Sequence, residues 1–389
     1  MRLSLIRHGA RTIPPHTGAT LFAMMRAFAG SAAVAAVSMV MAFGGTGSAS
    51  SRLAAPSPAP AGLGFSDTAE TVMGTLTAPP SQRFIARIRN GKMGGVLLLG
   101  NGWLTRSTAA NVTAELQQAA CMRGEPLLIG VDQEGGIVRR LAWAPPTEAP
   151  AEMSSPSVAQ EQGSAAATAL HSVGIDVDFA PVVDTPSTTR SFLGSRAFSR
   201  SRFWNASMAR SFVGGLQSNG VAATAKHFPG LGLASGNTDN GRIVIRAAAW
   251  KLREGLLPFR RAIQADAKLV MVSSAIYPKL DPSRLPGVYS KTIIQGLLRN
   301  TLGFKGVVVT DSLSAPAAYV VPHPATSAIA AGNDLLLFGS EGSSEWGYST
   351  LVSDSAKYPH LRMRLAQSAA RVRTLKAWLA AHGGSTCPG

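Results

Sequence analysis

Three short stretches of this 389-residue chain end an apolar run with residues that can perform acid–base or nucleophilic chemistry. They are VDQEGG with Asp132, AKHFPG with Lys226 and His227, and VVVTDS with Asp311. A buried parallel strand presents catalytic groups in this way, because its apolar run lies in the core and the following residues emerge at its carboxyl end. The three stretches therefore predict one polar mouth where carboxylates, a lysine and a histidine meet.

A mouth of this composition suits the hydrolysis of sugars. Sugar hydroxyls are recognised through charged hydrogen bonds, which are short and strong. A retaining glycosidase attacks the anomeric carbon with a carboxylate while a second group protonates the leaving oxygen. No cluster has metal-ligand spacing and no GxxxxGKS phosphate loop occurs, so we expect neither a metal nor a cofactor.

Apolar runs beyond residue 63 predict the elements that position these residues. We expect strands at 71–76, 95–100, 127–132, 175–180, 221–226, 269–274, 307–311 and 334–338. Helices are expected between them, at 108–120, 157–173, 200–218, 252–265, 291–301 and 361–381. This alternation predicts an α/β fold, a single-domain (β/α)8 TIM-type barrel over residues 63–389. A doubly wound sheet is the alternative, but no GxGxxG opens a helix after the first strand.

The chain resembles family 3 of the glycoside hydrolases, specifically the single-domain branch of β-N-acetylglucosaminidases (β-N-acetylhexosaminidases). The matching stretches run in family order over nearly all of residues 63–345. They are GGVLLLGN, PLLIGVDQEGGIVRRL, GIDVDFAPVVD, GSRAFS, VAATAKHFPGLG, LVMVSSAIYPKLD and LLRNTLGFKGVVVTDSL.

The resemblance implies a role for each matching polar residue. Asp311 would be the nucleophile, and the sugar would be bound by Asp132, Arg140, Arg196, Lys226 and His227. A nucleophile must stay ionised at neutral pH, and we expect Lys226 or Arg196 to help by lowering the pKa of Asp311. Asp184, in PVVD, is interpreted as structural.

The proton donor departs from the pattern of this branch, in which a flexible loop carries Asp-Ser-His and the histidine is the acid and base. This sequence has Asn237-Thr238-Asp239 there, and GLG replaces GHG after KHFP. One hypothesis is that Asp239 replaces the histidine, with a pKa raised by burial or by a like charge. The alternatives are that another group serves, that the reaction needs a good leaving group, or that the protein binds sugar without cleaving it.

Residues 1–50 are interpreted as an export signal with an over-extended start, because Met24-Met25-Arg26 precedes the apolar stretch 27–43 and Gly47-Ser48-Ala49 offers a cleavage site. Residues 51–62 read as a Pro/Ala linker. Arg7-His8-Gly9 matches the motif of histidine phosphatases. The apolar stretch of the export signal begins at residue 27, which leaves too few residues between for such a domain. We therefore expect a secreted or cell-wall-associated protein, held at a membrane only if the signal stays uncleaved.

The net charge of +16 suits an anionic partner, and an anionic cell-wall polymer fits better than nucleic acid because no Lys/Arg run or nucleic-acid motif occurs. Cys121 and Cys387 could pair in an exported protein, since both are expected at the barrel's amino-terminal face.

The function predicted from these observations is that of a monomeric, exported, retaining glycosidase. It would remove terminal β-linked N-acetylglucosamine, with peptidoglycan fragments as the natural substrate, through a covalent intermediate on Asp311. The alternatives are a sugar-binding protein without catalysis on the same barrel, and a family 3 hydrolase for another β-glycoside.

Overall fold

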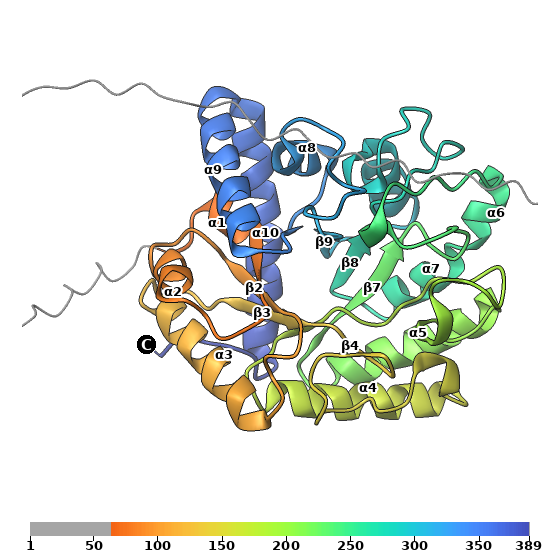
Figure 1. The fold of residues 1–389 in the computed structure, drawn as a ribbon, viewed down its shortest axis with the longest axis horizontal. Coiled ribbons are helices and arrows are strands. Elements are labelled where there is room, and N and C mark those ends of the chain that lie inside the picture. The colour runs from red at the N-terminus through yellow and green to blue at the C-terminus, as the bar shows by residue number, and fades with distance from the viewer. Residues whose placement is uncertain (1–63, 389) are drawn as a thin grey trace, which may run out of the picture. The chain divides into compact units, whose positions relative to one another are not determined.

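The structure, a computed structural model, describes residues 64–388, and eight parallel strands form a barrel in it (Figure 1). In order around the barrel these are β1 (Val72–Leu76), β2 (Gly95–Leu98), β3 (Leu128–Val131), β6 (Val177–Asp178), β7 (Ala222–Phe228), β8 (Leu269–Val272), β9 (Val307–Thr310) and β10 (Leu336–Leu337). β10 pairs with β1, and a parallel bridge from Val309 to Leu335 links β9 to the start of β10. The predicted (β/α)8 barrel is confirmed.

The expected export signal at 1–50, the linker at 51–62 and the first residue of the expected domain, 63, lie outside the described residues. Within residues 64–388, no helix has both the length and the apolar composition needed to cross a bilayer.

The strands are buried on both faces, which explains their apolar, β-branched composition. One set of side chains fills the barrel interior, and the opposite set packs beneath the surrounding helices. The interior set includes Met73, Leu97, Leu128, Phe179 and Val309. The interior is therefore a packed core, and space for a ligand exists only where the strands end.

Helices follow most of the strands and cover the barrel (Figure 1). They are α1 (Asp67–Glu70), α2 (Gln82–Arg89), α3 (Arg106–Cys121), α4 (Pro156–His171), α5 (Arg202–Gln217), α6 (Ala249–Glu254), α7 (Leu257–Gln264), the π-helical η5 (Thr292–Thr301), α8 (Pro324–Ala331), α9 (Glu341–Lys357) and α10 (Pro359–Ala381). The single helix expected at 252–265 is wrong, because α6 ends at Glu254, just before Gly255, and α7 begins at Leu257 with Pro258 in its first turn. Proline is tolerated there but not inside a continuous helix.

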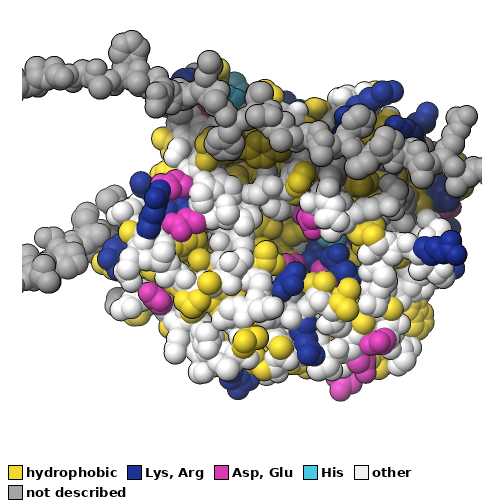
Figure 2. Space-filling model, viewed as in Figure 1, with side chains coloured by type: hydrophobic (Ala, Val, Ile, Leu, Met, Phe, Trp, Pro, Cys, Tyr) yellow, Lys and Arg dark blue, Asp and Glu magenta, His cyan; other side chains and the backbone are white. Residues whose placement is uncertain are grey.

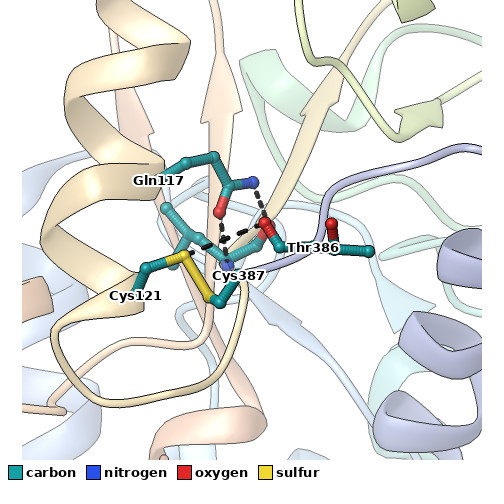
Figure 3. The surroundings of a disulfide bond; sticks show 5 residues. Gln117, Cys121, Thr386 and Cys387 are labelled. Carbon is teal, nitrogen blue, oxygen red and sulfur yellow. Dashed lines mark hydrogen bonds between the residues drawn. A yellow bond between two sulfur atoms is a disulfide. The ribbon is translucent and has the colours of Figure 1, made fainter. Parts of the chain in front are cut away.

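Two contacts fasten the last part of the described chain to α1 and α3. The ammonium of Lys376 in α10 lies 2.7 Å from the carboxylate of Glu70 in α1. Cys387 forms a disulfide with Cys121, the last residue of α3, with a Cα–Cα distance of 5.3 Å (Figure 3). Since α3 leads into β3, the disulfide lies at the amino-terminal face, away from the mouth.

Candidate active site

The DQEGG stretch forms a tight hairpin at the carboxyl end of β3. Its strands are β4 (Gln133–Gly135) and β5 (Val138–Arg139), which pair antiparallel. Gly135 has a φ of 103°, and a Cβ there would lie 2.3 Å from the carbonyl oxygen of Glu148, so glycine is required at the turn. The backbone N–H of Gln133 donates to the carboxylate of Asp178 at 3.0 Å. The hairpin is thereby fixed against β6, with Asp132 and Glu134 on either side of Gln133.

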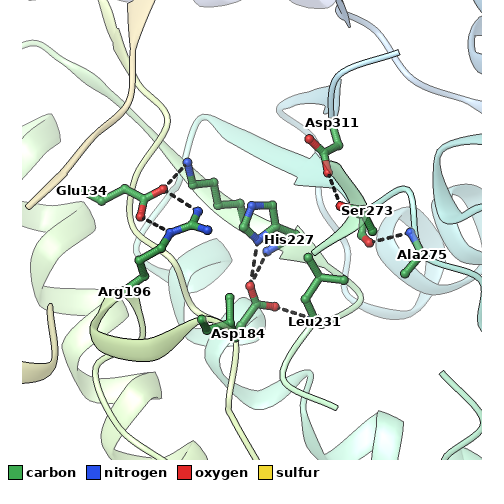
Figure 4. A network of polar contacts seen from close by, with 12 residues as sticks. Glu134, Asp184, Arg196, His227, Leu231, Ser273, Ala275 and Asp311 are labelled. Carbon is green, nitrogen blue, oxygen red and sulfur yellow. Dashed lines mark hydrogen bonds and ion pairs between the residues drawn. The ribbon is translucent and has the colours of Figure 1, made fainter. Parts of the chain in front are cut away.

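Lys226, near the end of β7, is at the centre of a network of charges. Its Nζ lies 2.6 Å from Oδ1 of Asp132 and 2.7 Å from Oε1 of Glu134. Arg196 donates to both oxygens of Glu134, through Nε at 2.7 Å and Nη2 at 2.8 Å (Figure 4). Burial by itself lowers the pKa of Lys226, but the two carboxylates raise it above its usual value. Lys226 is therefore a charged donor that orients Asp132.

Glu134 is a site residue that the sequence reasoning missed. Its side chain is 1% exposed. Burial raises the pKa of Glu134, but Lys226 and Arg196 overcome this effect and lower it to about 2. The sequence could have indicated Glu134, because side chains two residues apart on an extended chain point to the same side. Glu134 therefore points to the same side as Asp132.

His227 lies beside Lys226 at the mouth. The pairing of β7 with β8 shifts register between Lys226 and Phe228, so His227 is an extra residue at a bulge. Its Nδ1 lies 2.8 Å from Oδ2 of Asp184, and its backbone N–H donates to the same oxygen at 3.1 Å. Oδ1 of Asp184 accepts from the N–H of Leu231 at 2.6 Å. Asp184 thus fixes both the imidazole and the start of the next loop, in agreement with its expected structural role.

Asp311 follows β9 and lies at the mouth, with His227 between it and the Glu134–Arg196 pair (Figure 4). Its backbone N–H donates to the carbonyl of Val272 at 2.9 Å, which fixes its position at the end of β8. Its Oδ1 accepts from the N–H of Ser312 at 2.8 Å. The side chain is only partly buried, so its carboxylate can reach a ligand.

The expectation that a cation lowers the pKa of Asp311 is confirmed for Lys226, but burial outweighs this effect and the pKa of Asp311 is raised overall. Burial raises the pKa of Asp311; His227 and, more weakly, Lys226 lower it, while the negative charge of Asp239 raises it further. The guanidinium of Arg196 is engaged with Glu134 instead.

The loop after β7 brings Thr238 and Asp239 to the nucleophile candidate. Oγ1 of Thr238 lies 3.4 Å from Oδ2 of Asp311, and Thr238 is buried in the short 3-10 helix η3 (Thr238–Asn240). Asp239 is exposed, and its Oδ2 accepts a hydrogen bond of 3.1 Å from the side-chain amide of Asn237. Of the two conditions considered for Asp239, burial or a like charge, burial is therefore not found, whereas a like charge is present because Asp239 acts on Asp311.

Arg140, unlike the predicted site residues Asp132, Lys226 and Arg196, takes no part in the ion pairs at the mouth. Its backbone N–H donates to the carbonyl of Asp132 at 3.3 Å. Its buried Nε has no hydrogen-bond partner among the described residues. Arg140 thus lies next to the mouth without joining the ion pairs.

The structure brings the remaining predicted residues together at the carboxyl ends of the strands. In Figure 2, acidic and basic side chains lie beside a histidine near the middle of the face that is viewed. Over residues 64–388, no group of three or more His, Cys, Asp or Glu is arranged to hold a metal. The arrangement offers a partly exposed carboxylate facing a fixed set of charged hydrogen-bonding groups, which suits sugar recognition and nucleophilic attack.

Comparisons with known proteins agree with this geometry. Residues 69–375 match the model of the glycosyl hydrolase family 3 N terminal domain. A protein named beta-hexosaminidase from Nitrosomonas eutropha is 33% identical over 292 residues, which is 69% of this chain and 82% of that protein. A beta-hexosaminidase from Pseudomonas aeruginosa is 37% identical over 239 residues, 58% of this chain and 70% of that protein.

Solved structures of known proteins also resemble this barrel. A glycoside hydrolase family 3 beta-N-acetylglucosaminidase from a Paenibacillus species has a TM-score of 0.76 at 30% identity, covering 83% of this chain and 64% of that chain. Part of that protein therefore has no counterpart here. A beta-N-acetylhexosaminidase from Beutenbergia cavernae has a TM-score of 0.74 at 29% identity, covering 80% of this chain and 97% of that chain.

Proposed function

Because the chain belongs to glycosyl hydrolase family 3 and is a glycosidase, we propose that it removes terminal β-linked N-acetylglucosamine from glycans. The observation that carries this proposal is the partly exposed carboxylate of Asp311 at the same mouth as the ion-paired Asp132, Glu134 and Lys226. The names of its relatives, beta-hexosaminidase and beta-N-acetylglucosaminidase, support the choice of sugar.

In the proposed mechanism Asp311 is the nucleophile and the reaction proceeds with retention. An oxygen of Asp311 attacks the anomeric carbon while the bond from that carbon to the leaving oxygen breaks and that oxygen takes up a proton. Water then attacks the same carbon and gives a proton to the group that protonated the leaving oxygen, while the bond from that carbon to the carboxylate of Asp311 breaks. In this mechanism Asp132, fixed by Lys226 at 2.6 Å, accepts hydrogen bonds from sugar hydroxyls. Arg196, His227 and Arg140 are the further proposed sugar contacts.

Asp239 is the proposed donor of the proton. Thr238 contacts Asp311 from the same turn of η3, so Asp239 lies one residue away from a group that touches the nucleophile. The general acid of a glycosidase must approach the leaving oxygen in order to protonate it. The exposed position of Asp239 on a loop with several glycines lets that loop close over a substrate and bury the carboxylate.

Peptidoglycan fragments are the proposed substrate, and an exported monomer that is secreted or bound to the cell wall is the proposed state. The net charge of +16 favours association with an anionic wall polymer. The disulfide between Cys121 and Cys387 fits an oxidising compartment, where such bonds persist.

The experiment that tests the proposal compares hydrolysis of 4-nitrophenyl N-acetyl-β-glucosaminide with that of the matching β-glucoside. The proposal expects turnover of the first and little of the second. Preference for the glucoside would favour a family 3 hydrolase of another specificity. A folded protein that binds chitobiose and cleaves neither substrate would be a sugar-binding protein.

A further inference from the structure

A cationic cavity lies at the amino-terminal face of the barrel, the face opposite the candidate active site. Its volume is about 230 Å³, and it is lined by Gln295, Arg299, Asn300, Phe304, Lys305 and Arg371. Lys305 lies just before β9, whereas Asp311 follows that strand. Three of the six lining residues are cations and none of the six is acidic.

A single buried carboxylate, that of Asp334, pairs with the arginines around this cavity. Its Oδ1 accepts from Arg364 at 3.0 Å and from Arg371 at 3.1 Å. Its Oδ2 accepts from Arg299 and, at 2.9 Å, from the backbone N–H of Val308. Since a carboxylate offers about four lone-pair positions, Asp334 has no capacity for a further donor. Three positive charges therefore share one negative charge.

Donors are left over in this cluster. Arg371 makes its hydrogen bonds through Nη1, to Asp334 and to the carbonyl of Gln367, so its Nε and Nη2 have no partner among residues 64–388. Nη1 of Arg364 is buried and has no partner in the same part of the chain. Lys305 is exposed, and its ammonium takes part in no ion pair with a described residue. The cluster can therefore still bind an anion.

Arg299 forms a fixed wall of the cavity. Its side chain is 9% exposed, and its Nη1 donates to the carbonyls of Phe304 at 3.0 Å and Gly306 at 2.7 Å. Burial lowers the pKa of Arg299, Asp334 raises it, and the two arginines of α10 lower it again. The arginines are thus close enough to repel one another, and a bound anion would relieve this repulsion.

A second cavity adjoins the first, because Lys305 and Arg371 line both. Its volume is about 280 Å³, and its other lining residues are Asp266, Lys268, Gly306, Val307, Thr374, Leu375 and Trp378. The one acid in this lining, Asp266, is paired with Lys268. Most of the remaining lining is apolar or uncharged. A ligand that spans both cavities would therefore join an anionic group to an uncharged, carbon-rich unit.

We propose that the two cavities bind an anionic polymer of the cell wall, with one of its phosphate or carboxylate groups in the cationic cavity. The proposal goes beyond hydrolysis and rests on the proposed association of the protein with the wall. Guanidinium groups suit both kinds of anion, because their planar fork makes paired hydrogen bonds to two oxygens. A nucleic acid fits less well, since the disulfide between Cys121 and Cys387 favours an oxidising compartment.

The position of this site leaves the active site accessible while the polymer is bound. The cationic cavity lies at the amino-terminal ends of the strands, beside Lys305, and the proposed nucleophile Asp311 lies at the carboxyl end of the same strand. A protein held by its amino-terminal face would keep the catalytic mouth free for a separate glycan. Binding of the polymer and turnover of substrate should therefore be independent.

The test measures the binding of labelled polyphosphate and labelled poly-L-glutamate, matched in their number of charges, to the full-length protein. The variant K305Q/R371Q removes two cations that line both cavities. The control K92Q/R210Q removes two exposed cations that lie outside both linings. K305Q alone guards against a folding defect, because the side chain of Lys305 is exposed, and thermal unfolding shows whether each variant is folded.

We expect the Kd for the preferred polymer to rise about tenfold in K305Q/R371Q, about threefold in K305Q and less than about twofold in K92Q/R210Q. Binding should weaken as ionic strength rises. The tighter of the two polymers identifies the bound group as phosphate or carboxylate. Equal weakening in the two double variants would overturn the site. Tighter binding of a single-stranded oligonucleotide of equal charge would overturn the choice of a wall polymer.

Hydrolysis separates this proposal from the proposed function. Turnover of 4-nitrophenyl N-acetyl-β-glucosaminide should be the same in K305Q/R371Q as in the wild type, because both substitutions lie at the opposite face from Asp311. A wild type that binds a polyanion without cleaving the glycoside contradicts the proposed function alone. A wild type that cleaves the glycoside and binds neither polyanion contradicts the polymer site alone.

Discussion

The ammonium of Lys226 lies 2.7 Å from the carboxylate of Glu134, and both side chains are almost completely buried at 3% and 1% exposure. Lys226 also contacts Asp132 at 2.6 Å, while Glu134 is held from its other side by Arg196. Buried charges are costly unless each is paired and hydrogen-bonded, and this network satisfies both conditions. It therefore fixes the orientation of Asp132, the proposed ligand of sugar hydroxyls.

Replacing Glu134 by glutamine should destabilise the protein, because Lys226 would lose one of the two carboxylates that compensate its burial. We expect the free energy of unfolding to fall by about 3 kcal/mol. Urea denaturation measures this change. Glu254→Gln is the control, since Glu254 forms an exposed ion pair with Arg202 and its loss should cost less than about 1 kcal/mol.

The same pair predicts the pH dependence of stability. The pKa of Glu134 is about 2 in the folded protein and 4.5 in its reference state. Its contribution is therefore complete above pH 4.5 and is lost as the pH falls towards 2. The difference in stability between wild type and Glu134→Gln should shrink over this range. A difference that stayed constant down to pH 3 would mean that Glu134 is not held ionised by Lys226 and Arg196.

The raised pKa of Asp311 predicts the acidic limb of the pH–rate profile. A nucleophile must be ionised, so kcat/KM should fall as the pH drops through the pKa of Asp311, which burial places above its ordinary value of 3.8. Asp239→Asn removes a negative charge that raises this pKa, so the acidic limb should move to lower pH. The measurement uses a nitrophenyl substrate, whose leaving group departs without a proton. Movement to higher pH would contradict the electrostatic link between Asp239 and Asp311.

The role of Asp239 as acid predicts a dependence on the leaving group. Asp239→Ala should lower kcat/KM about a hundredfold on an unactivated disaccharide and less than about tenfold on a nitrophenyl glycoside. Equal losses on the two substrates would exclude Asp239 as the proton donor. Asn240→Ala, a change in the exposed neighbour within η3, is the matched control and should affect both substrates only slightly.

The disulfide should contribute measurably to stability, because it closes a long loop of the chain with a sequence separation of 266 residues. Replacing Cys121 and Cys387 by serine should lower the free energy of unfolding by about 3 kcal/mol. Thermal unfolding with and without a reductant measures the effect. The wild type should respond to the reductant and the double variant, which retains no cysteine, should not. Equal responses would mean that the disulfide does not stabilise the fold.

The sequence was sufficient to predict the strands and several of the helices, because the barrel strands are short apolar runs that charged or glycine residues terminate. It was also sufficient to place Asp132, Lys226, His227 and Asp311 at one mouth. The break between α6 and α7 was missed because an amphipathic pattern continues through Gly255.

Glu134 and the raised pKa of Asp311 were missed for a different reason. Both depend on which charges become neighbours after folding. Lys226 forms ion pairs with Asp132 and Glu134, whereas it acts on Asp311 only weakly, through its charge. Periodicity assigns a residue to a strand end, but burial and pairing at that end arise from segments far apart in the chain.

The central claim is that the carboxylate of Asp311 attacks the anomeric carbon. Its most direct test is to trap the glycosyl–enzyme with a fluorinated N-acetylglucosaminyl donor whose second step is slow, and to map the labelled peptide by mass spectrometry. The proposed mechanism predicts one sugar on Asp311 and no labelling of Asp311→Asn. A sugar attached to another residue, or labelling that persists in Asp311→Asn, would contradict it.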